Sequence, residues 1–200
     1  MKAANTLDPE TIRTYEAVLE QKLNERMYGT VSVFQYKLKD VIEQFVDPAD
    51  DLLVFRNSDA IKATGIDTEL RGTWENGFQG RAGYSFVEAK NEQTGEIPVN
   101  SPRHLAKFNL IAPLIKKSLF AGIELQYTSR VKTLSDHYAD DFWITNLTLT
   151  YENIVKGLEV SASVYNLFDV DYGNPGAGEH TQDIIQQDGR TFRVKVTYRF

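Results

Sequence analysis

A two-residue alternation of apolar and polar side chains at the end of the chain limits its possible folds more than any other feature. Along residues 190–200, one side carries the apolar side chains Phe192, Val194, Val196, Tyr198 and Phe200. The other side carries the polar side chains Arg193, Lys195, Thr197 and Arg199. Successive side chains of a β-strand point to opposite faces, so this pattern predicts a strand between two different environments. A strand at the edge of a soluble sheet has the same pattern, so this segment alone does not identify a membrane sheet.

The same alternation recurs along the rest of the chain. In one example, Trp143, Leu147 and Tyr151 alternate with Asn146 and Thr150. The polar faces hold charged and small residues, and the apolar faces often end on an aromatic side chain, as expected of a barrel with lipid outside and water inside. The predicted fold class is therefore all-β, an antiparallel transmembrane β-barrel, of which this chain supplies about nine strands of a larger whole. We expect these strands at residues 11–23, 27–43, 52–74, 78–90, 104–115, 118–131, 141–153, 157–168 and 190–200.

The connections between these segments alternate between short and long. The short ones lie at residues 24–26, 75–77, 116–118 and 153–157. The long ones lie at residues 44–51, 90–103, 132–140 and 171–189. In outer-membrane barrels, short turns face the periplasm and long loops face outward. The order of the connections therefore favours an outer-membrane barrel over a soluble sandwich.

The first of these segments permits two interpretations. Pro9 directly after Asp8 is typical of a helix start. Apolar residues at helical spacing follow, namely Ile12, Tyr15, Leu19, Leu23 and Met27. Local preference alone therefore favours a helix over residues 11–23, although tertiary context commonly overrides such a preference.

Composition excludes several classes of protein. The net charge is −6, whereas a nucleic-acid-binding domain usually presents a basic face, so no nucleic-acid partner is expected. Cysteine is absent, which leaves no disulfide and no thiolate nucleophile or metal ligand. The longest apolar run is residues 110–115, far shorter than the roughly 20 residues of a transmembrane helix. The N-terminus has no apolar signal-peptide core, so we expect any export signal to lie outside these residues.

Motifs in the last quarter of the chain resemble those of a known family. Asn166-Leu167-Phe168-Asp169, followed by Tyr172, resembles the penultimate-strand motif of TonB-dependent outer-membrane receptors. The sequence from Arg190 through Phe192 to Tyr198 and Phe200 is similar to the closing strand of these receptors, with its terminal aromatic residue. Upstream, residues 7–16, 57–67 and 102–104 are similar to other strands of the family, although Asp67 stands where Glu is usual. The resemblance covers nearly all 200 residues and favours a strand over a helix at residues 11–23.

The resemblance implies that residues 1–200 are the C-terminal portion of a barrel of about 22 strands and that the N-terminal plug domain and TonB-contacting segment are absent. The parent receptor would be a multi-pass protein of the cell outer membrane. It would import a ferric siderophore, cobalamin or a similar bulky ligand with energy from the TonB complex. Its expected partners are outer-membrane lipid, the TonB complex, a siderophore-like ligand and the barrel assembly machinery, which recognises the terminal aromatic. A passive porin or a small structural outer-membrane barrel is the alternative.

No segment predicts catalysis, a cofactor or a metal site. Residues 135–137 are Ser-Asp-His, but a catalytic triad is assembled in space and not from sequence neighbours. His137 has Asp136, Asp140 and Asp141 nearby, which a solvated acidic loop explains better than a metal site. Residues 169–173 begin like a calcium loop but have glycine where a third oxygen ligand is needed. We therefore expect a transport element and not an enzyme.

The polar faces of the predicted strands would form the inner wall of the barrel. The charged and amide residues expected there are Asp67, Glu69, Arg71, Glu124, Gln126, Glu152, Glu159, Arg193, Lys195 and Arg199. Mixed charges on such a wall suit ion pairs with a plug domain. A wall that is only hydrated is the other interpretation. The residues that contact a transported ligand are not predicted.

Overall fold

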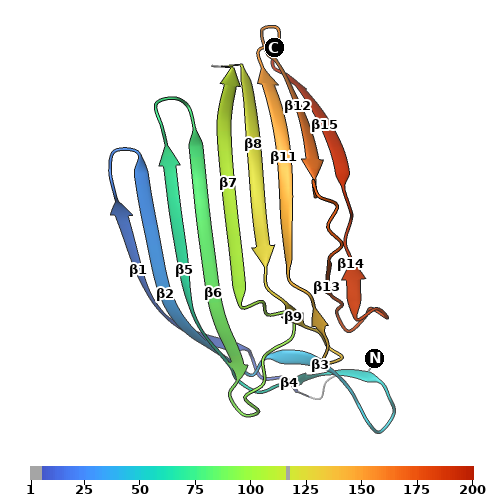
Figure 1. The fold of residues 1–200 in the computed structure, drawn as a ribbon. Helices are drawn as coiled ribbons and strands as arrows, with labels where there is room; N and C mark the ends of the chain where they lie inside the picture. The colour runs from blue at the N-terminus through green and yellow to red at the C-terminus, as the bar shows by residue number, and fades with distance from the viewer. Residues whose placement is uncertain (1–5, 116–117) are drawn as a thin grey trace.

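Long antiparallel registers between successive strands build one curved sheet in the computed structural model, which describes residues 6–115 and 118–200 (Figure 1). The sheet has nine strands in the order β1-β2-β5-β6-β7-β8-β11-β12-β15. Their bounds are Thr11–Lys22 (β1), Met27–Lys39 (β2), Ile61–Thr73 (β5), Gln79–Asn91 (β6), His104–Ile115 (β7), Leu119–Thr128 (β8), Phe142–Glu152 (β11), Leu158–Tyr165 (β12) and Thr191–Tyr198 (β15). The number of long strands and their antiparallel order confirm the predicted fold class, with the barrel left open between β1 and β15.

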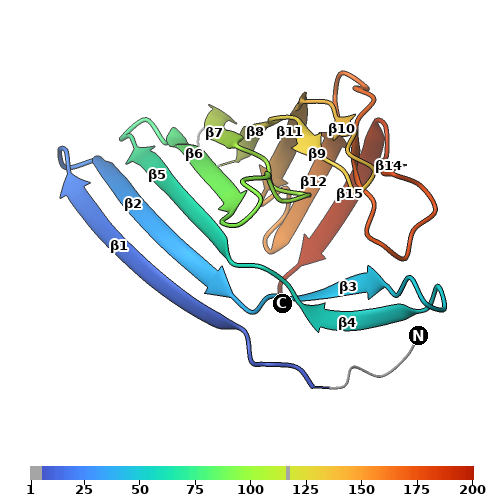
Figure 2. The same cartoon turned by 90° about the horizontal axis from the view of Figure 1, so that it is seen from below.

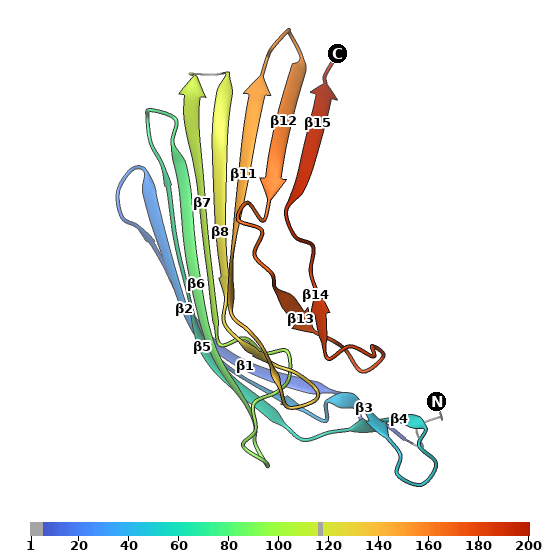
Figure 3. The same ribbon diagram turned by 45° about the vertical axis from the view of Figure 1, so that its right-hand side comes forward.

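Three small hairpins lie in the long connections, at the end of the sheet opposite the tight turns (Figure 3). They pair β3 (Ile42–Val46) with β4 (Leu53–Asn57), β9 (Val131–Lys132) with β10 (Tyr138–Ala139), and β13 (Gly173–Pro175) with β14 (Ile184–Gln186). Seen from below in Figure 2, the β3–β4 hairpin crosses the open side of the curved sheet. It reaches the β13–β14 connection, where a Cβ added to Gly178 would lie 3.6 Å from Gln44 Oε1. The hairpins therefore meet across the mouth of the curved sheet.

Three predicted strands and three predicted loops differ from the structure in their extent. Residues 118–131 divide into β8 and the separate β9, and the loops expected at residues 132–140 and 171–189 contain β10, β13 and β14. Residues 27–43 divide into β2 and the start of β3, because Asp40 has a φ of 57° and turns the chain. Residues 52–74 likewise divide into β4 and β5. The Asn57 side chain donates to the carbonyls of Asp8 and Asp40 and so ties the end of β4 to the ends of two other segments. Part of the loop expected at residues 44–51 belongs to β3, and the turn expected at 116–118 lies partly outside the described residues.

Residues 11–22 form a strand and not a helix, as the family resemblance indicates. Every residue of β1 pairs with β2, from Thr11 opposite Lys39 to Lys22 opposite Tyr28. This ladder satisfies the backbone hydrogen bonds along one edge of β1. A helix formed by the same residues would have no surface against which to pack its apolar side chains. In the described part of the chain, no helix is both long enough and apolar enough to cross a membrane.

The register assigns each side chain to one of two faces. Ser32 lies opposite Asp67, which lies opposite Ser85, so these polar residues share the concave inner face. Val33 lies opposite Ile66, which lies opposite Phe86, on the convex outer face. Outer-face side chains such as Val194 (71% exposed) lie open on a sheet with few buried apolar residues. An exposed apolar exterior around a polar interior is the inverse of a soluble domain and is typical of a membrane barrel.

Aromatic rings cover glycines where neighbouring strands approach. Gly72 lies opposite Gly80, and a Cβ on either residue would contact the Trp74 ring, at 2.8 Å and 3.4 Å respectively. On the inner face, a Cβ on Gly65 would lie 2.6 Å from the Phe86 carbonyl oxygen and would overlap the Phe34 ring. Glycine at these positions lets the rings approach the backbone closely, which fills gaps in a wall only one layer thick.

Candidate functional site

The inner face of β1, β2, β5, β6 and β7 forms an open, charged groove of about 640 Å³. Three predicted inner-wall residues, Asp67, Glu69 and Arg71, line this groove. Arg81 pairs with Glu69 across it. An adjoining groove of about 620 Å³ continues past Arg71 toward the turn between β1 and β2. These surfaces present charges of both signs to the interior and suit a polar macromolecular partner better than an apolar ligand.

The remaining predicted inner-wall residues lie on the same face. The Asn146 amide donates to Glu124 at 2.8 Å, and Arg199 pairs with Glu159 at 3.3 Å. The register places four further residues on this face, namely Gln126, Glu152, Arg193 and Lys195. The prediction of which side chains face inward is therefore confirmed for all ten residues.

The Asn-Leu-Phe-Asp motif ends β12 and anchors the loop that follows. Asn166 has a φ of 48° and is 3% exposed. Its Oδ1 accepts from the Val170 amide at 2.8 Å, and its Nδ2 donates to the Val170 carbonyl at 2.9 Å. Asn146 Oδ1 accepts from the Asn166 amide at 2.9 Å, and the Leu167 amide donates to the Thr145 carbonyl at 2.8 Å. The motif thus makes a turn that is held to β11 by two hydrogen bonds.

Asp169 joins this turn to the start of the last strand. Its Oδ1 accepts from the Arg190 amide at 2.6 Å, and its Oδ2 lies 3.5 Å from the Arg190 guanidinium. The Tyr172 ring contacts the Phe142 ring with a centroid separation of 4.6 Å. The spacing between the motif and Arg190 therefore has a structural reason: the two ends of the 171–189 loop are fastened to each other. Phe168 is 70% exposed.

The terminal aromatic residues have a different environment. Phe192 and Tyr198 lie on the outer face of β15, and both are mostly exposed. Phe200 follows β15 and is fully exposed. Their position is that of side chains on the lipid side of a barrel.

Asp183 connects two loops, although it belongs to none of the sequence motifs. Its Oδ2 accepts from the Thr133 hydroxyl at 2.8 Å and lies 3.1 Å from His137 Nδ1, and its Oδ1 accepts from the Ser135 amide at 3.3 Å. Hydrogen bonds from Thr133, Ser135 and His137 hold the pKa of the Asp183 carboxyl below its ordinary value, the Thr133 bond having the largest effect. Because Asp183 is 46 residues from His137, no local pattern points to the pair. We call these four residues the loop clamp.

The acidic and histidine-containing segments are engaged in contacts between loops. Ser135 and His137 both contact Asp183 in the loop clamp. Asp169 binds Arg190 rather than forming part of a calcium loop. Across the residues that the structure describes, no group of three or more His, Cys, Asp or Glu side chains is arranged to hold a metal ion.

An open antiparallel sheet with a charged, polar inner face and an apolar outer face defines a segment of the wall of an outer-membrane β-barrel. The family model described as "TonB dependent receptor-like, beta-barrel" matches residues 2–167. The chain therefore belongs to the TonB-dependent receptor β-barrel family, and its place is the cell outer membrane.

Individual proteins show the same relationship. The ferric-pyoverdine 358 receptor of Pseudomonas putida is 25% identical over 185 residues, which cover 87% of this chain and 22% of that protein. The ferric-catecholate import receptor Fiu of E. coli superimposes with a TM-score of 0.76 at 19% identity, over 97% of this chain and 28% of that one. The copper transporter OprC superimposes with a TM-score of 0.79 at 18% identity, over 98% of this chain and 32% of that one. The chain spans about a fifth of the length of the curated relatives, and the named proteins are receptors and transporters rather than enzymes.

Proposed function

We propose that this chain forms barrel wall and outer loops of an energy-coupled receptor that imports a ferric siderophore. The observation that carries the proposal is sequence similarity to a ferric-pyoverdine receptor over 87% of the chain. The charged inner wall supports it, because an energy-coupled receptor needs a surface that holds a plug domain. A passive porin, the alternative, needs only a hydrated channel.

Among bulky ligands, ferric siderophores have more support than cobalamin. The two curated relatives are both ferric-pyoverdine receptors, and one structural neighbour imports ferric catecholates. The copper transporter shares the same fold, so the fold itself does not specify the cargo. The choice of siderophore over cobalamin therefore rests on sequence similarity.

The test uses a complete receptor that contains this chain. We would express it in a Gram-negative strain that lacks ferric-siderophore receptors and measure uptake of radioiron-labelled ferric pyoverdine, with TonB active or deleted. We expect uptake that requires both the receptor and TonB. Uptake that continues without TonB would support the passive porin instead. Uptake of cobalamin, with none of any ferric siderophore offered, would contradict the ligand class.

We further propose that the long connections face the cell exterior and the tight turns face the periplasm. The three hairpins and the loop clamp all lie at the loop end, which fits a ligand-facing mouth. Single cysteines at Asp136 and Asn76 would report the orientation through labelling of intact cells with an impermeant maleimide. We expect labelling at position 136 only, and labelling at position 76 only would reverse the orientation.

We also propose that residues 1–200 are the C-terminal portion of the receptor barrel, with the plug domain supplied from outside them. In this arrangement Phe200, Tyr198 and Phe192 form the signal read by the barrel assembly machinery. The exposure of these rings on one side supports that role. Deletion of Phe200 should lower the outer-membrane level of the receptor more than deletion of the loop residue Gly178, as measured by immunoblotting of membrane fractions. Equal levels would remove this assignment.

A further inference from the structure

Four basic residues lie directly opposite one another across four neighbouring strands. The register pairs Arg13 with Lys37, Lys37 with Lys62, and Lys62 with Lys90. We call these four residues the cationic row. Strands lie about 4.8 Å apart, so the row extends about 14 Å across the sheet. Like charges directly opposite each other destabilise a sheet, and such a row therefore needs compensation.

The cationic row lies on the outer face of the sheet. Each of its residues is an even number of positions from an apolar outer-face residue of its own strand, so both side chains point to the same face. These apolar residues include Val33 in β2, Ile66 in β5 and Phe86 in β6. The charged groove lies on the other face, where Ser32 and Asp67 line it. The row therefore does not contribute to the hydrated interior.

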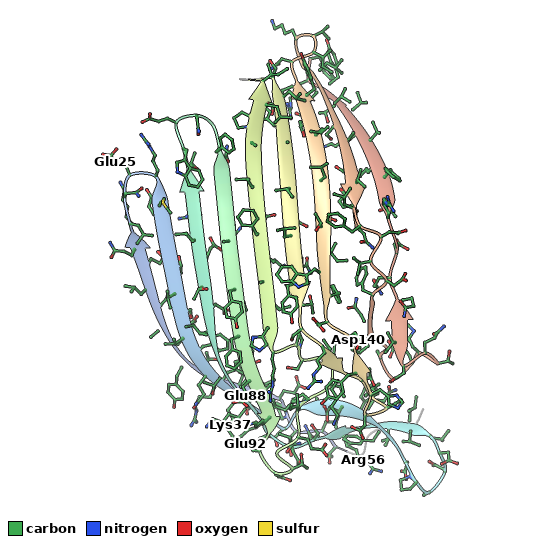
Figure 4. The ribbon with its side chains drawn as sticks, viewed as in Figure 1. Glu25, Lys37, Arg56, Glu88, Glu92 and Asp140 are labelled. Carbon is green, nitrogen blue, oxygen red and sulfur yellow. The ribbon has the colours of Figure 1, made fainter. Side chains whose placement is uncertain are left out.

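Carboxylates compensate only part of this charge. Glu92 pairs with Lys37, and Glu88 pairs with Lys90 at 2.9 Å. Glu88 also lies 3.6 Å from Arg103, a fifth cation beside the row. Figure 4 shows the labelled Lys37, Glu88 and Glu92 at the loop end of the sheet. Within residues 6–115 and 118–200, neither Arg13 nor Lys62 makes an ion pair, so two carboxylates face five cations.

The height of the row places it just beyond the hydrocarbon of the membrane. At about 3.3 Å per residue, the eleven steps along the chain from Arg26 to Lys37 extend about 36 Å, or about 28 Å of height at a strand tilt near 40°. The thirteen steps from Gly77 to Lys90 give about 33 Å of height by the same reasoning. The apolar band of an outer-membrane barrel is about 25 Å tall. The cations therefore lie at the level of lipid headgroups.

A cluster of rings marks the interface directly below this level. Phe86 lies four residues closer to the turn than Lys90 and contacts the His104 ring at a centroid separation of 5.1 Å. The Tyr84 hydroxyl lies 2.7 Å from His104 Nδ1. Further along the sheet, Tyr127 and Trp143 pack at 4.8 Å. Aromatic belts of this kind lie at the membrane–water interface, so they fix the boundary independently of the height calculation.

A pocket of about 340 Å³ extends the basic surface beyond β6. It is lined by Arg103, Arg130, Lys132 and His104, with Asp141 as its carboxylate. Arg130 lies over the Tyr138 ring at 4.9 Å, and Lys132 pairs with Asp136 at 2.7 Å. Cations therefore continue around the outer face at one level.

We propose that the cationic row and the adjoining pocket bind phosphate groups of lipid headgroups in the leaflet at the loop end. Phosphate oxygens accept charge-assisted hydrogen bonds from guanidinium and ammonium groups, and one phosphate bridges cations on two neighbouring strands. Arg13 and Lys62, which make no ion pair with the residues that the structure describes, are the principal ligands. Lipid phosphate removes the like-charge repulsion that the register imposes, which makes this part of the barrel selective for anionic lipid.

The test compares two double variants of a complete receptor. Arg13→Gln with Lys62→Gln removes one Arg and one Lys from the outer face, and Arg193→Gln with Lys195→Gln removes the same charges from the inner face. Binding of diphosphoryl lipid A and of phosphatidylcholine would be titrated by native mass spectrometry in detergent. At about 1 kcal/mol per cation near an anionic lipid surface, we expect about thirtyfold weaker lipid A binding for the outer-face variant. We expect a change below threefold for the inner-face variant and no change in phosphatidylcholine binding.

Several outcomes would overturn the proposal. Equal lipid A binding by the wild type and the outer-face variant would remove the site, and an equal loss in both variants would indicate nonspecific attraction. Displacement of lipid A by millimolar inorganic phosphate would indicate a free-anion site instead. Heat-modifiable gel mobility confirms that each variant is folded. As a measurement that needs no variant, raising the salt concentration should weaken lipid A binding to the wild type, and insensitivity to salt would also contradict the proposal.

Discussion

Substitution of Asn166 by alanine tests whether the Asn-Leu-Phe-Asp motif is a structural anchor. The substitution removes two side-chain hydrogen bonds to Val170, at 2.8 Å and 2.9 Å. Each is worth about 1 kcal/mol, and more where a poorly solvated backbone group is left without a partner. Alanine must also adopt a φ of 48°, which costs about 1 kcal/mol more than for asparagine. We expect the anchor to lose about 2–4 kcal/mol in total.

This loss should be local, because the nine long strands keep their ladders. Hydrogen exchange of a complete receptor in detergent would report it at the amides of Val170 and Arg190, which the anchor protects. A loss of about 2–4 kcal/mol corresponds to exchange faster by about thirtyfold to several hundredfold. Asn76→Ala is the matched control, because its exposed side chain makes one long bond, 3.4 Å, to the Phe78 amide. Unchanged exchange at both amides, or equal acceleration in the control, would refute the reasoning.

Two further perturbations test packing and electrostatics. Gly65→Ala places a Cβ 2.6 Å from the Phe86 carbonyl oxygen and should cost about 1–3 kcal/mol in urea denaturation, whereas Gly83→Ala, whose Cβ would lie 3.6 Å from the nearest atom, should cost less than 1 kcal/mol. A similar cost at both positions would contradict this account of the Gly65 contact. Because the pKa of Asp183 is lowered in the folded protein, its contribution to the stability of the loop clamp is complete above the ordinary aspartate pKa of about 3.9. That contribution is lost as the pH falls through the lower pKa of the folded protein. Acid-protease cleavage between β13 and β14 should therefore rise below pH 4 in the wild type, while Asp183→Asn should remove most of that pH dependence. An unchanged pH dependence in this variant would exclude Asp183 as its origin.

The long strands were predictable because each side of the sheet faces a different environment. The alternation along β15 identifies its outer face without knowledge of its neighbour, and all ten predicted inner-wall residues lie on the predicted face. The first segment was ambiguous because Ile12, Tyr15 and Leu19 fit a helix as well as a strand. The family resemblance favours the strand, and the ladder with β2, which is a non-local interaction, confirms it.

The small hairpins and the loop clamp were not predictable from local patterns. β3 and β4 are five residues each, too short for a two-residue period to stand out. β3 overlaps the loop expected at residues 44–51, and β4 lies inside the single strand expected at residues 52–74. The position of Asp183 depends on the distant Thr133, 50 residues away. The cationic row is also hidden in the sequence, because Arg13 and Lys90 reach one level only through three successive registers.

The loop clamp changes the entropy of loop closure at the mouth. Two long loops that move independently would each lose conformational freedom on contact with a ligand, but Asp183 already holds the 132–140 and 171–189 loops together. The β3–β4 hairpin touches the second of these loops near Gly178. A ligand that orders one of these three loop segments therefore also orders the other two, and the additional loss of conformational entropy is smaller than for independent loops. We therefore expect the loops to order cooperatively when a ligand binds at this mouth. We also expect them to open together, over a single large free-energy barrier in place of several small ones.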